Sequence, residues 1–193
     1  MSEYCERYLV EGRKWLGRET KVEWGRYPVE REPIRRWCHM ANCLNPLYLD
    51  EEYARKTKWG GIVSPPLMVR LWADAGGPPS ASGPEIDWPP TDYSSIGNVV
   101  PPTPGIKAIN LGGGWEFSTV VRLGEYIGSK VKLTDFYIKP MRYDVEAFWI
   151  ATQTIFVNQK LETVAVNNNL IIKHRDPEQI KATTPEQLAQ LKA

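Results

Sequence analysis

The sequence predicts an α+β fold in which a helix lies across an antiparallel sheet. In the first 75 residues, apolar side chains recur at helical spacing. From residue 106 onward the period changes to two, and β-branched and aromatic residues become frequent, as is typical of strands. A proline-rich stretch with little periodicity separates the two halves. Helices followed by a run of antiparallel strands favour the α+β class.

Short helices are expected in the first half of the chain. Residues 2–10 follow the pattern of a short helix, for which Ser2 is a favourable N-cap. Residues 21–29 have extended character. Residues 33–41 carry apolar side chains at i, i+3, i+4 and i+7, and residues 50–56 resemble another short helix.

The segment SPPLMVRLWADAGG, residues 64–77, is the best candidate for a buried central helix. Ser64 can cap it, and proline suits the first helical position. Two glycines end the segment. The apolar stripe of this helix is expected to consist of Leu67, Met68, Leu71 and Trp72.

The second half of the chain is expected to form the sheet. Its strands are predicted at residues 106–123, 131–138, 147–157 and 161–173. Asn158 and Gln159 are expected to form the hairpin turn before the last strand.

The chain is expected to be a single domain over residues 1–193, with a core at about residues 20–175. A proline-rich insertion is placed at about residues 78–105. A C-terminal helical tail is placed at about residues 184–193, where Thr and Gln are spaced as in a capping box.

Composition argues against several classes of function. The 24 basic and 23 acidic residues leave a net charge of +1, which gives no electrostatic case for nucleic acid or a membrane surface. No run approaches the ~20 apolar residues of a membrane span, and no signal peptide is apparent, so we expect a cytoplasmic protein. Three cysteines without C-x-x-C spacing and two distant histidines predict neither a disulfide framework nor a metal site.

The segment NPLYLDEEYARKTKWGGIVSPPLM, residues 45–68, resembles the MaoC-like hydratases, and more closely their dehydratase-type N-terminal branch. The resemblance covers roughly residues 22–173 and includes GGGWEF at residues 112–117. It implies the hotdog fold, in which a curved antiparallel sheet wraps around a central helix. Family members hydrate trans-2-enoyl-CoA thioesters or dehydrate the (R)-3-hydroxyacyl form, so the CoA thioester is the substrate and no cofactor is implied.

The active members share a motif written Gly-Asp-x-Asn-Pro-hydrophobic-His, whose Asp and His flank the reacting water. Asn45, Pro46 and Leu47 match three positions of this motif. The Asp position falls on Cys43, and the His position falls on Tyr48. A thiol of pKa ~8.5 and a phenol of pKa ~10 are mostly protonated at neutral pH, so neither replaces the proton-transfer group.

The family's oxyanion donor is a backbone N–H at the start of the central helix. This position falls on Pro65, with Pro66 beside it. Proline has no N–H, and losing one such donor typically costs ~10²–10³ in rate. With all three parts missing, we assign no catalytic residue to this chain.

The resemblance therefore implies an acyl-binding, non-catalytic subunit of a heteromeric trans-2-enoyl-CoA hydratase or (R)-3-hydroxyacyl-CoA dehydratase. A second hotdog subunit would bring the Asp and His, and the long proline-rich insertion suggests a bulky acyl group. The residues expected at the substrate are Asn45, Pro46, Tyr48, Ser64, Pro65, Pro66, Trp88 and Trp115.

Two alternatives stay open. The chain could be a self-sufficient homodimeric hydratase that uses Cys43, Tyr48 or one of the loop acids Glu85, Asp87 and Asp92. It could also be an acyl-CoA binding module without catalysis. Structural readings of the same residues exist as well, because Asn-Pro favours turns and a cysteine is more often a packed side chain than a nucleophile.

Overall fold

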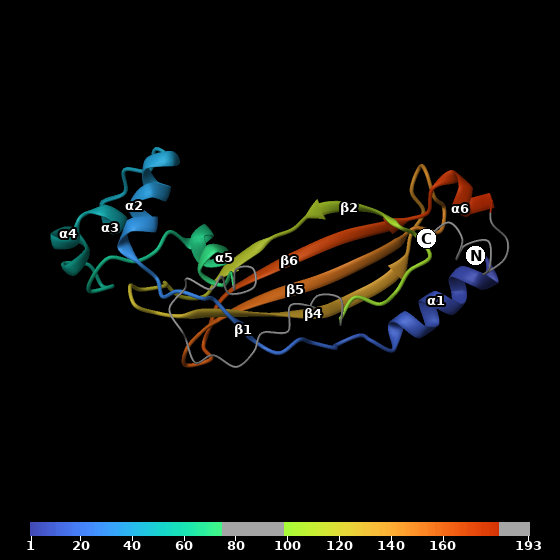
Figure 1. Ribbon diagram of the computed structural model, residues 1–193, viewed down its shortest axis with the longest axis horizontal. Coiled ribbons are helices and arrows are strands. Elements are labelled where there is room, and N and C mark those ends of the chain that lie inside the picture. The colour runs from blue at the N-terminus through green and yellow to red at the C-terminus, as the bar shows by residue number, and fades with distance from the viewer. Residues whose placement is uncertain (75–98, 182–193) are drawn as a thin grey trace, which may run out of the picture.

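The centre of the molecule is one antiparallel sheet (Figure 1). The computed structural model describes residues 1–74 and 99–181. Within them the strand order is β1-β4-β5-β6-β2, and β3 pairs with β6 as well. The strands are β1 Glu23–Trp24, β2 Lys107–Gly112, β3 Trp115–Phe117, β4 Ile127–Ile138, β5 Phe148–Asn158 and β6 Thr163–His174. The predicted α+β class with an antiparallel sheet is confirmed.

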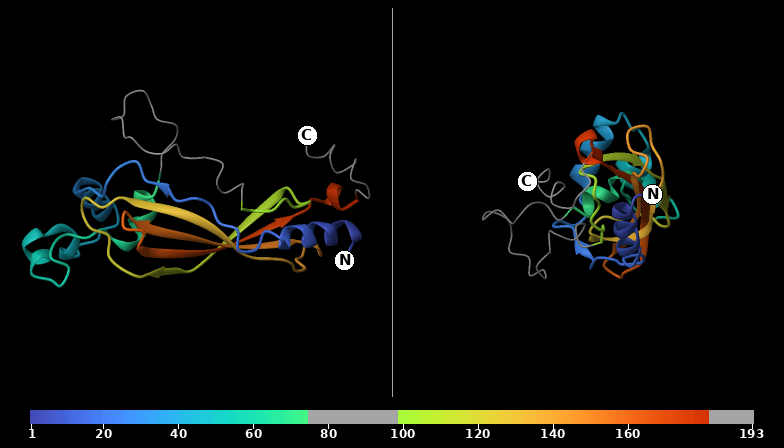
Figure 2. Two further views of the ribbon diagram at one scale, coloured as in Figure 1. Left: turned by 90° about the horizontal axis from the view of Figure 1, so that it is seen from below. Right: turned by 90° about the vertical axis from the view of Figure 1, so that its right-hand side faces the viewer.

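Helices lie mostly at the two ends of the sheet, and the long strands twist between them (Figure 2). The described helices are α1 Glu3–Arg13, α2 Arg31–Met40, α3 Pro46–Leu49, α4 Glu51–Arg55, α5 Val69–Trp72 and α6 Pro177–Lys181. None of the helices in the described ranges is long and apolar enough to cross a membrane.

The sheet carries two hydrophobic clusters. One lies beneath α1, where Cys5 and Leu9 pack with Phe136 and Phe148. The other gathers α5 and the helical segment α2–α4 against the opposite end of the sheet. Its buried members include Ile34, Cys38, Ala54, Ile62, Met68, Val69, Trp72, Val121, Phe156, Val164 and Ala165. The second cluster holds the segment that resembles the hydratase motif.

Helix α1 packs closely against the sheet at Gly12. A Cβ atom there would lie 2.2 Å from Cε1 of Phe136, whose ring is fully buried. Alanine would favour the helix by about 1 kcal/mol, but overpacking a filled core costs about 1–3 kcal/mol. We expect Gly12→Ala to lower the free energy of unfolding in urea by about 1 kcal/mol. The exposed Glu11→Ala is the control, and unchanged or increased stability of Gly12→Ala would contradict this account of the contact.

The central helix is shorter in the described residues than the sequence predicts. A 3₁₀ turn at Pro66–Met68 precedes α5, and the residues after 74 lie outside the described part. Leu67 and Leu71, placed in the apolar stripe by the sequence, are 58% and 54% exposed. The other two predicted members, Met68 and Trp72, are buried as expected, and Val69 joins them.

The predicted strand at residues 106–123 is wrong in its extent. It divides into β2 and β3 around the glycines at 112–114, and β3 ends at Phe117. At Gly113 the backbone passes so close to Asn168 that a Cβ would lie 1.5 Å from its carbonyl oxygen. A continuous strand is therefore interrupted where only glycine fits.

The hairpin between β5 and β6 is also longer than predicted. It spans residues 159–162, with Leu161 in the left-handed region at φ 62°. Asn158 accounts for the length, because its side-chain oxygen accepts hydrogen bonds from the backbone N–H groups of Lys160 and Glu162 at 3.0 and 3.1 Å. The predicted helical tail at residues 184–193 and most of the proline-rich insertion lie outside the described residues.

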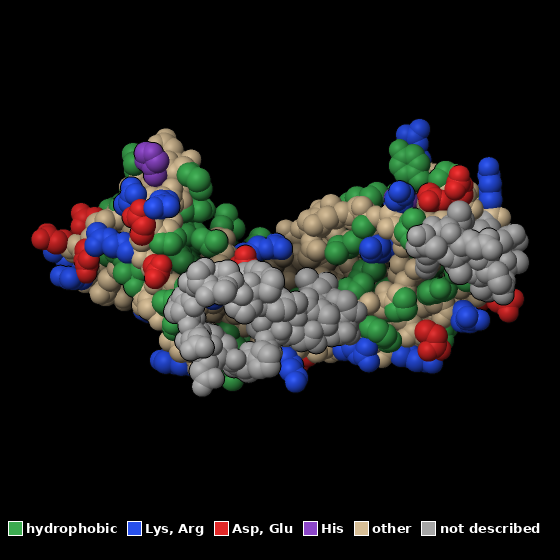
Figure 3. Space-filling model, viewed as in Figure 1, with side chains coloured by type: hydrophobic (Ala, Val, Ile, Leu, Met, Phe, Trp, Pro, Cys, Tyr) green, Lys and Arg blue, Asp and Glu red, His purple; other side chains and the backbone are tan. Residues whose placement is uncertain are grey.

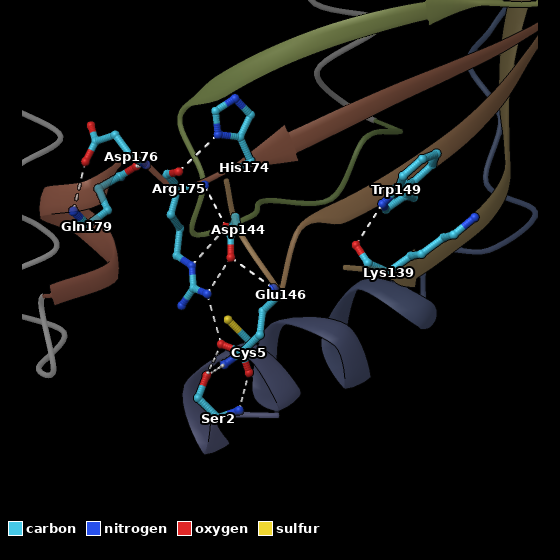
Figure 4. A network of polar contacts seen from close by, with 10 residues as sticks. All are labelled: Ser2, Cys5, Lys139, Asp144, Glu146, Trp149, His174, Arg175, Asp176 and Gln179. Carbon is cyan, nitrogen blue, oxygen red and sulfur yellow. Dashed lines mark hydrogen bonds and ion pairs between the residues drawn. The ribbon is translucent and has the colours of Figure 1, made fainter. Parts of the chain in front are cut away.

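The α1 end of the sheet is closed by a buried polar network (Figure 4). The Arg175 guanidinium, at the end of β6, donates two hydrogen bonds to the Asp144 carboxylate, at 2.7 and 3.1 Å. It also donates to Glu146 at 3.0 Å. Glu146 in turn accepts hydrogen bonds from the backbone N–H and the hydroxyl of Ser2, the N-cap of α1. The network therefore connects the first turn of α1 to the end of the sheet.

Candidate functional site

The motif-like segment lies in a helical lobe made of α2, α3 and α4, which projects beyond the end of the sheet (Figures 1 and 2). In the space-filling view a hollow separates this lobe from the sheet (Figure 3). Hydrophobic side chains gather on the side of the lobe that faces the sheet, and charged side chains gather on its far side.

Asn45 and Pro46 build the start of α3. The Asn45 side-chain oxygen accepts a hydrogen bond from the Leu47 N–H at 3.0 Å, and Pro46 occupies the first helical position. Both residues are exposed. This arrangement is an N-cap followed by a favourable proline, so local structure alone accounts for the Asn-Pro step. Their contact with a substrate stays a prediction.

The residues at the family's Asp and His positions lie against the end of α2. Asn42 adopts φ 50°, and the Cys43 N–H donates to the Cys38 carbonyl at 2.8 Å, which ends the helix. Burial, with a smaller contribution from the neighbouring Cys43 thiol, raises the pKa of Cys38. Burial, with smaller contributions from the two thiols, also raises the pKa of Tyr48. The Tyr48 phenol and the Cys38 thiol are therefore neutral at pH 7.

The raised pKa of Tyr48 gives a direct prediction. We expect its phenol to ionise above its ordinary pKa of about 10, because burial disfavours phenolate. The ultraviolet difference between the wild type and Tyr48→Phe during an alkaline titration isolates this ionisation. Ionisation below about pH 9 would show an activated phenol and contradict the neutral assignment.

The start of the α5 segment provides no hydrogen-bond donor at two successive positions. Pro65 and Pro66 both lack a backbone N–H. Ser64 does not cap the helix, contrary to the prediction: Pro65 is the N-cap of the 3₁₀ turn, with no side-chain hydrogen bond. The buried Ser64 hydroxyl accepts a hydrogen bond from the indole N–H of Trp72 at 2.7 Å and donates to the Pro65 carbonyl at 3.2 Å.

Ser64→Ala would leave the Trp72 N–H buried without its partner. An unsatisfied buried donor costs about 1–3 kcal/mol, so we expect the free energy of unfolding to fall by that amount. Ser64→Ala combined with Trp72→Phe removes both partners, and the coupling energy from this double-mutant cycle isolates the hydrogen bond. Strictly additive effects in urea denaturation would show that the contact contributes nothing.

A cavity of about 220 Å³ lies beside this helix start. It is lined by Trp59, Ser64, Pro66, Val69, Phe117, Ser118, Thr119, Val120, Val121, Val164 and Ala165. The Ser64 N–H donates to the Val121 carbonyl at 2.8 Å, and Val63 bridges to Arg122, so two distant segments form one wall. Among the described residues, no side chain of the lining titrates near neutral pH, and no group of His, Cys, Asp or Glu could hold a metal ion.

The cavity brings together only part of the predicted substrate set. Ser64 and Pro66 line it, whereas Trp115 lies behind the lining residue Phe117 and stacks on its ring. Trp88 lies outside the described residues. The other predicted residues, Asn45, Pro46, Tyr48 and Pro65, are not part of the lining.

Sequence reasoning missed two aromatic members of the lining. Trp59 sits on a turn fixed by the Thr57 hydroxyl, which accepts a hydrogen bond from the Trp59 N–H at 3.2 Å. Phe117 is the last residue of β3. Both residues lie inside the stretches that carry the family resemblance, WGG and GGGWEF, and that was the available signal.

Comparison with known proteins decides the family. The sequence matches the family described as FAS1-like, dehydratase domain region, over residues 14–166. The chain belongs to this FAS1-like dehydratase family. The MaoC-like resemblance expected from the sequence is thereby confirmed.

Solved structures show that the FAS1-like dehydratase region of this chain has the expected hotdog fold. A chain of the ChsH1-ChsH2 complex from Mycobacterium tuberculosis superposes with a TM-score of 0.66 and 20% identity, covering 90% of this chain and 97% of the other. A MaoC-like dehydratase from Rhodospirillum rubrum gives a TM-score of 0.55 at 18% identity, with coverages of 84% and 94%.

Curated relatives of this FAS1-like dehydratase match over shorter stretches. A probable enoyl-CoA hydratase alpha subunit from Thermomonospora curvata is 36% identical over 72 residues, which are 37% of this chain and 23% of the relative. A 3-oxo-4,17-pregnadiene-20-carboxyl-CoA hydratase alpha subunit from Mycobacterium tuberculosis is 35% identical over 57 residues, covering 30% and 18%. The match spans about a fifth of the length of these relatives.

Proposed function

We propose that this chain is an acyl-binding, non-catalytic subunit of a heteromeric trans-2-enoyl-CoA hydratase or (R)-3-hydroxyacyl-CoA dehydratase. A second hotdog subunit supplies the Asp and His that activate water. The single observation that carries the proposal is the cavity: it lies at the start of the family's helix, is mostly apolar, and has no proton-transfer group among the described residues that line it.

The chemistry around the cavity supports an acyl-binding role for this chain and a proton-transfer role for the partner. Hydration needs a base for water, an acid for the carbon that becomes protonated, and a donor for the enolate oxygen. Tyr48 has a raised pKa and is protonated at pH 7. The two prolines at the helix start provide no donor. What this chain does provide is an apolar compartment, which is the requirement for holding an acyl group.

The names of the relatives support the heteromeric part of the proposal. Two curated relatives are called alpha subunits of CoA-thioester hydratases. Two structural neighbours are complexes of differently named chains, ChsH1-ChsH2 and HadBC. A self-sufficient homodimer that relies on Tyr48 is disfavoured by its raised pKa.

The purified chain tests the proposal when it is assayed for hydration of trans-2-hexenoyl-CoA, followed as the loss of enoyl absorbance. We expect no turnover above the buffer rate, together with measurable binding of the thioester. Ligand-induced stabilisation against heat reports that binding independently of chemistry. Appreciable turnover by the pure chain would overturn the proposal, and absence of any thioester binding would overturn its acyl-binding part.

A further inference from the structure

The walls of the cavity point to a more specific ligand. Phe117 is the outermost ring of an aromatic stack. Its ring lies 5.6 Å from the Trp115 ring with an interplanar angle of 2°, and Trp115 lies 5.6 Å from Phe156 at 22°. Phe156 is buried in the sheet, which fixes the stack to the core. Trp115 stacks on one face of Phe117, and Phe117 is a partly exposed member of the cavity lining.

A second aromatic side chain, Trp59, lines the same cavity from the turn after α4. The Lys58 ammonium lies 4.5 Å from the centre of the Trp59 rings. The rest of the described lining is made of small and branched side chains, which include the hydroxyl-bearing Ser118 and Thr119. A flat apolar group matches two ring walls, and Ser118 and Thr119 are exposed, so their hydroxyls can stay hydrated beside it.

The volume of the cavity limits the size of that group. Apolar cavities of about 150 Å³ bind benzene, which has six carbon atoms. A cavity of about 220 Å³ therefore holds a group of about nine carbon atoms. Pockets for drug-sized molecules are larger, at about 300–1,000 Å³. A single ring with a short side chain fills this volume, and the second ring of a fused system would lie outside it.

We propose that the cavity beside Phe117 holds the single aromatic ring of an aryl-substituted enoyl-CoA. The inference rests on the proposed acyl-binding function and names its substrate class. It departs from the bulky acyl group that the proline-rich insertion suggests, because it is argued from the described lining alone. The ring of the ligand extends the Phe117–Trp115–Phe156 stack by one member.

Three CoA thioesters test the size and shape of the site, with Kd measured by titration calorimetry on the purified chain. Trans-cinnamoyl-CoA carries one ring and nine acyl carbons, trans-2-nonenoyl-CoA has the same number of carbons in a line, and 3-(2-naphthyl)acryloyl-CoA carries a fused pair of rings. One additional stacked pair corresponds to about two- to ten-fold in Kd, so we expect cinnamoyl-CoA to bind tighter than nonenoyl-CoA by that factor. We expect the naphthyl thioester to bind more weakly than the cinnamoyl thioester.

Two variants locate the effect at the cavity. Phe117→Leu should reduce the preference for cinnamoyl over nonenoyl to about one-fold, because the stacking partner is lost. Tyr143→Leu, an exposed aromatic residue that does not line the cavity, is the matched control and should keep the preference. Val120→Trp fills the space from a half-buried position and should reduce binding of every acyl thioester to that of free CoA.

Equal Kd values for the phenyl and linear thioesters, or a naphthyl thioester that binds at least as tightly as the phenyl one, would overturn the inference. Failure of all three to bind more tightly than free CoA would also overturn it. Binding is measured without turnover, so loss of the ring preference leaves the proposed function standing. Turnover by the pure chain would overturn the proposed function and leave the ring preference intact.

Discussion

Asp144→Ala should destabilise the protein by about 3–5 kcal/mol, the cost of removing one partner of a buried ion pair, although Arg175 keeps its contact with Glu146. Arg175 keeps only 10% of its side chain exposed and Asp144 keeps none. The substitution removes both guanidinium hydrogen bonds and a third from the Arg175 backbone N–H at 2.8 Å. Urea denaturation measures the change in the free energy of unfolding.

Two controls separate the buried network from charge removal in general. Glu32 pairs with Arg35 and Arg36 on the surface of α2, and Glu32→Ala should change stability little because solvent screens exposed ion pairs. Asp144→Leu combined with Arg175→Met removes both charges, and it should cost less than Asp144→Ala. A double variant that is less stable than Asp144→Ala would contradict this interpretation.

The same carboxylate determines part of the acid sensitivity. Burial would raise the pKa of Asp144, but hydrogen bonds from Arg175 and from the Glu146 backbone outweigh it and lower the pKa. A pKa lowered by folding stabilises the native state above the ordinary Asp value of about 3.9, and this contribution is lost as pH falls through the folded value. Wild type should therefore lose more stability than Asp144→Ala when the pH is lowered from 6 to about 3.

Placing the family's reacting groups in this chain should create measurable hydration of trans-2-hexenoyl-CoA. Cys43→Asp with Tyr48→His supplies the proton-transfer pair, which contributes about 10²–10⁴ in rate where it is well positioned. Adding Pro65→Ala restores the backbone N–H at the position that corresponds to the oxyanion donor, and should raise the rate by a further factor of about 10²–10³. Pro65 has φ −51°, which alanine adopts without strain.

Pro66→Ala is the matched control for the third substitution. It restores an N–H one position later in the same turn, on a side chain that is exposed. We expect it to give no comparable gain in rate over the double variant. Equal gains from the two alanine substitutions would contradict the assignment of residue 65 as the donor position.

The fold could be predicted from periodicity because its long elements have strong signals. The predicted strands that correspond to β4, β5 and β6, and the predicted N-cap Ser2, agree with the structure. The predictions that fail are those in which single residues determine the local backbone conformation. Two prolines start the α5 segment with a 3₁₀ turn, Gly113 breaks the β2–β3 edge, and Asn158 closes a loop longer than a two-residue turn.

The candidate site was predictable in its chemistry and less so in its geometry. Reading the motif identifies Cys43 and Tyr48 as replacements, and the structure adds that burial raises the pKa of Tyr48. The cavity depends on tertiary contacts that no local pattern specifies. Trp59, the turn at Ser64 and the stretch after Phe117 are far apart in the sequence, and only the folded sheet places them around one space.

The central claim is that another chain supplies the proton-transfer groups, and the most direct measurement is turnover by a reconstituted complex. This chain is combined with a hotdog partner that carries the Asp and His, and hydration of trans-2-hexenoyl-CoA is followed with wild-type and substituted subunits. The account predicts that Asp→Asn or His→Ala in the partner abolishes turnover while thioester binding persists. Turnover that survives these partner substitutions, and is instead abolished by Cys43→Ala or Tyr48→Phe in this chain, would contradict it.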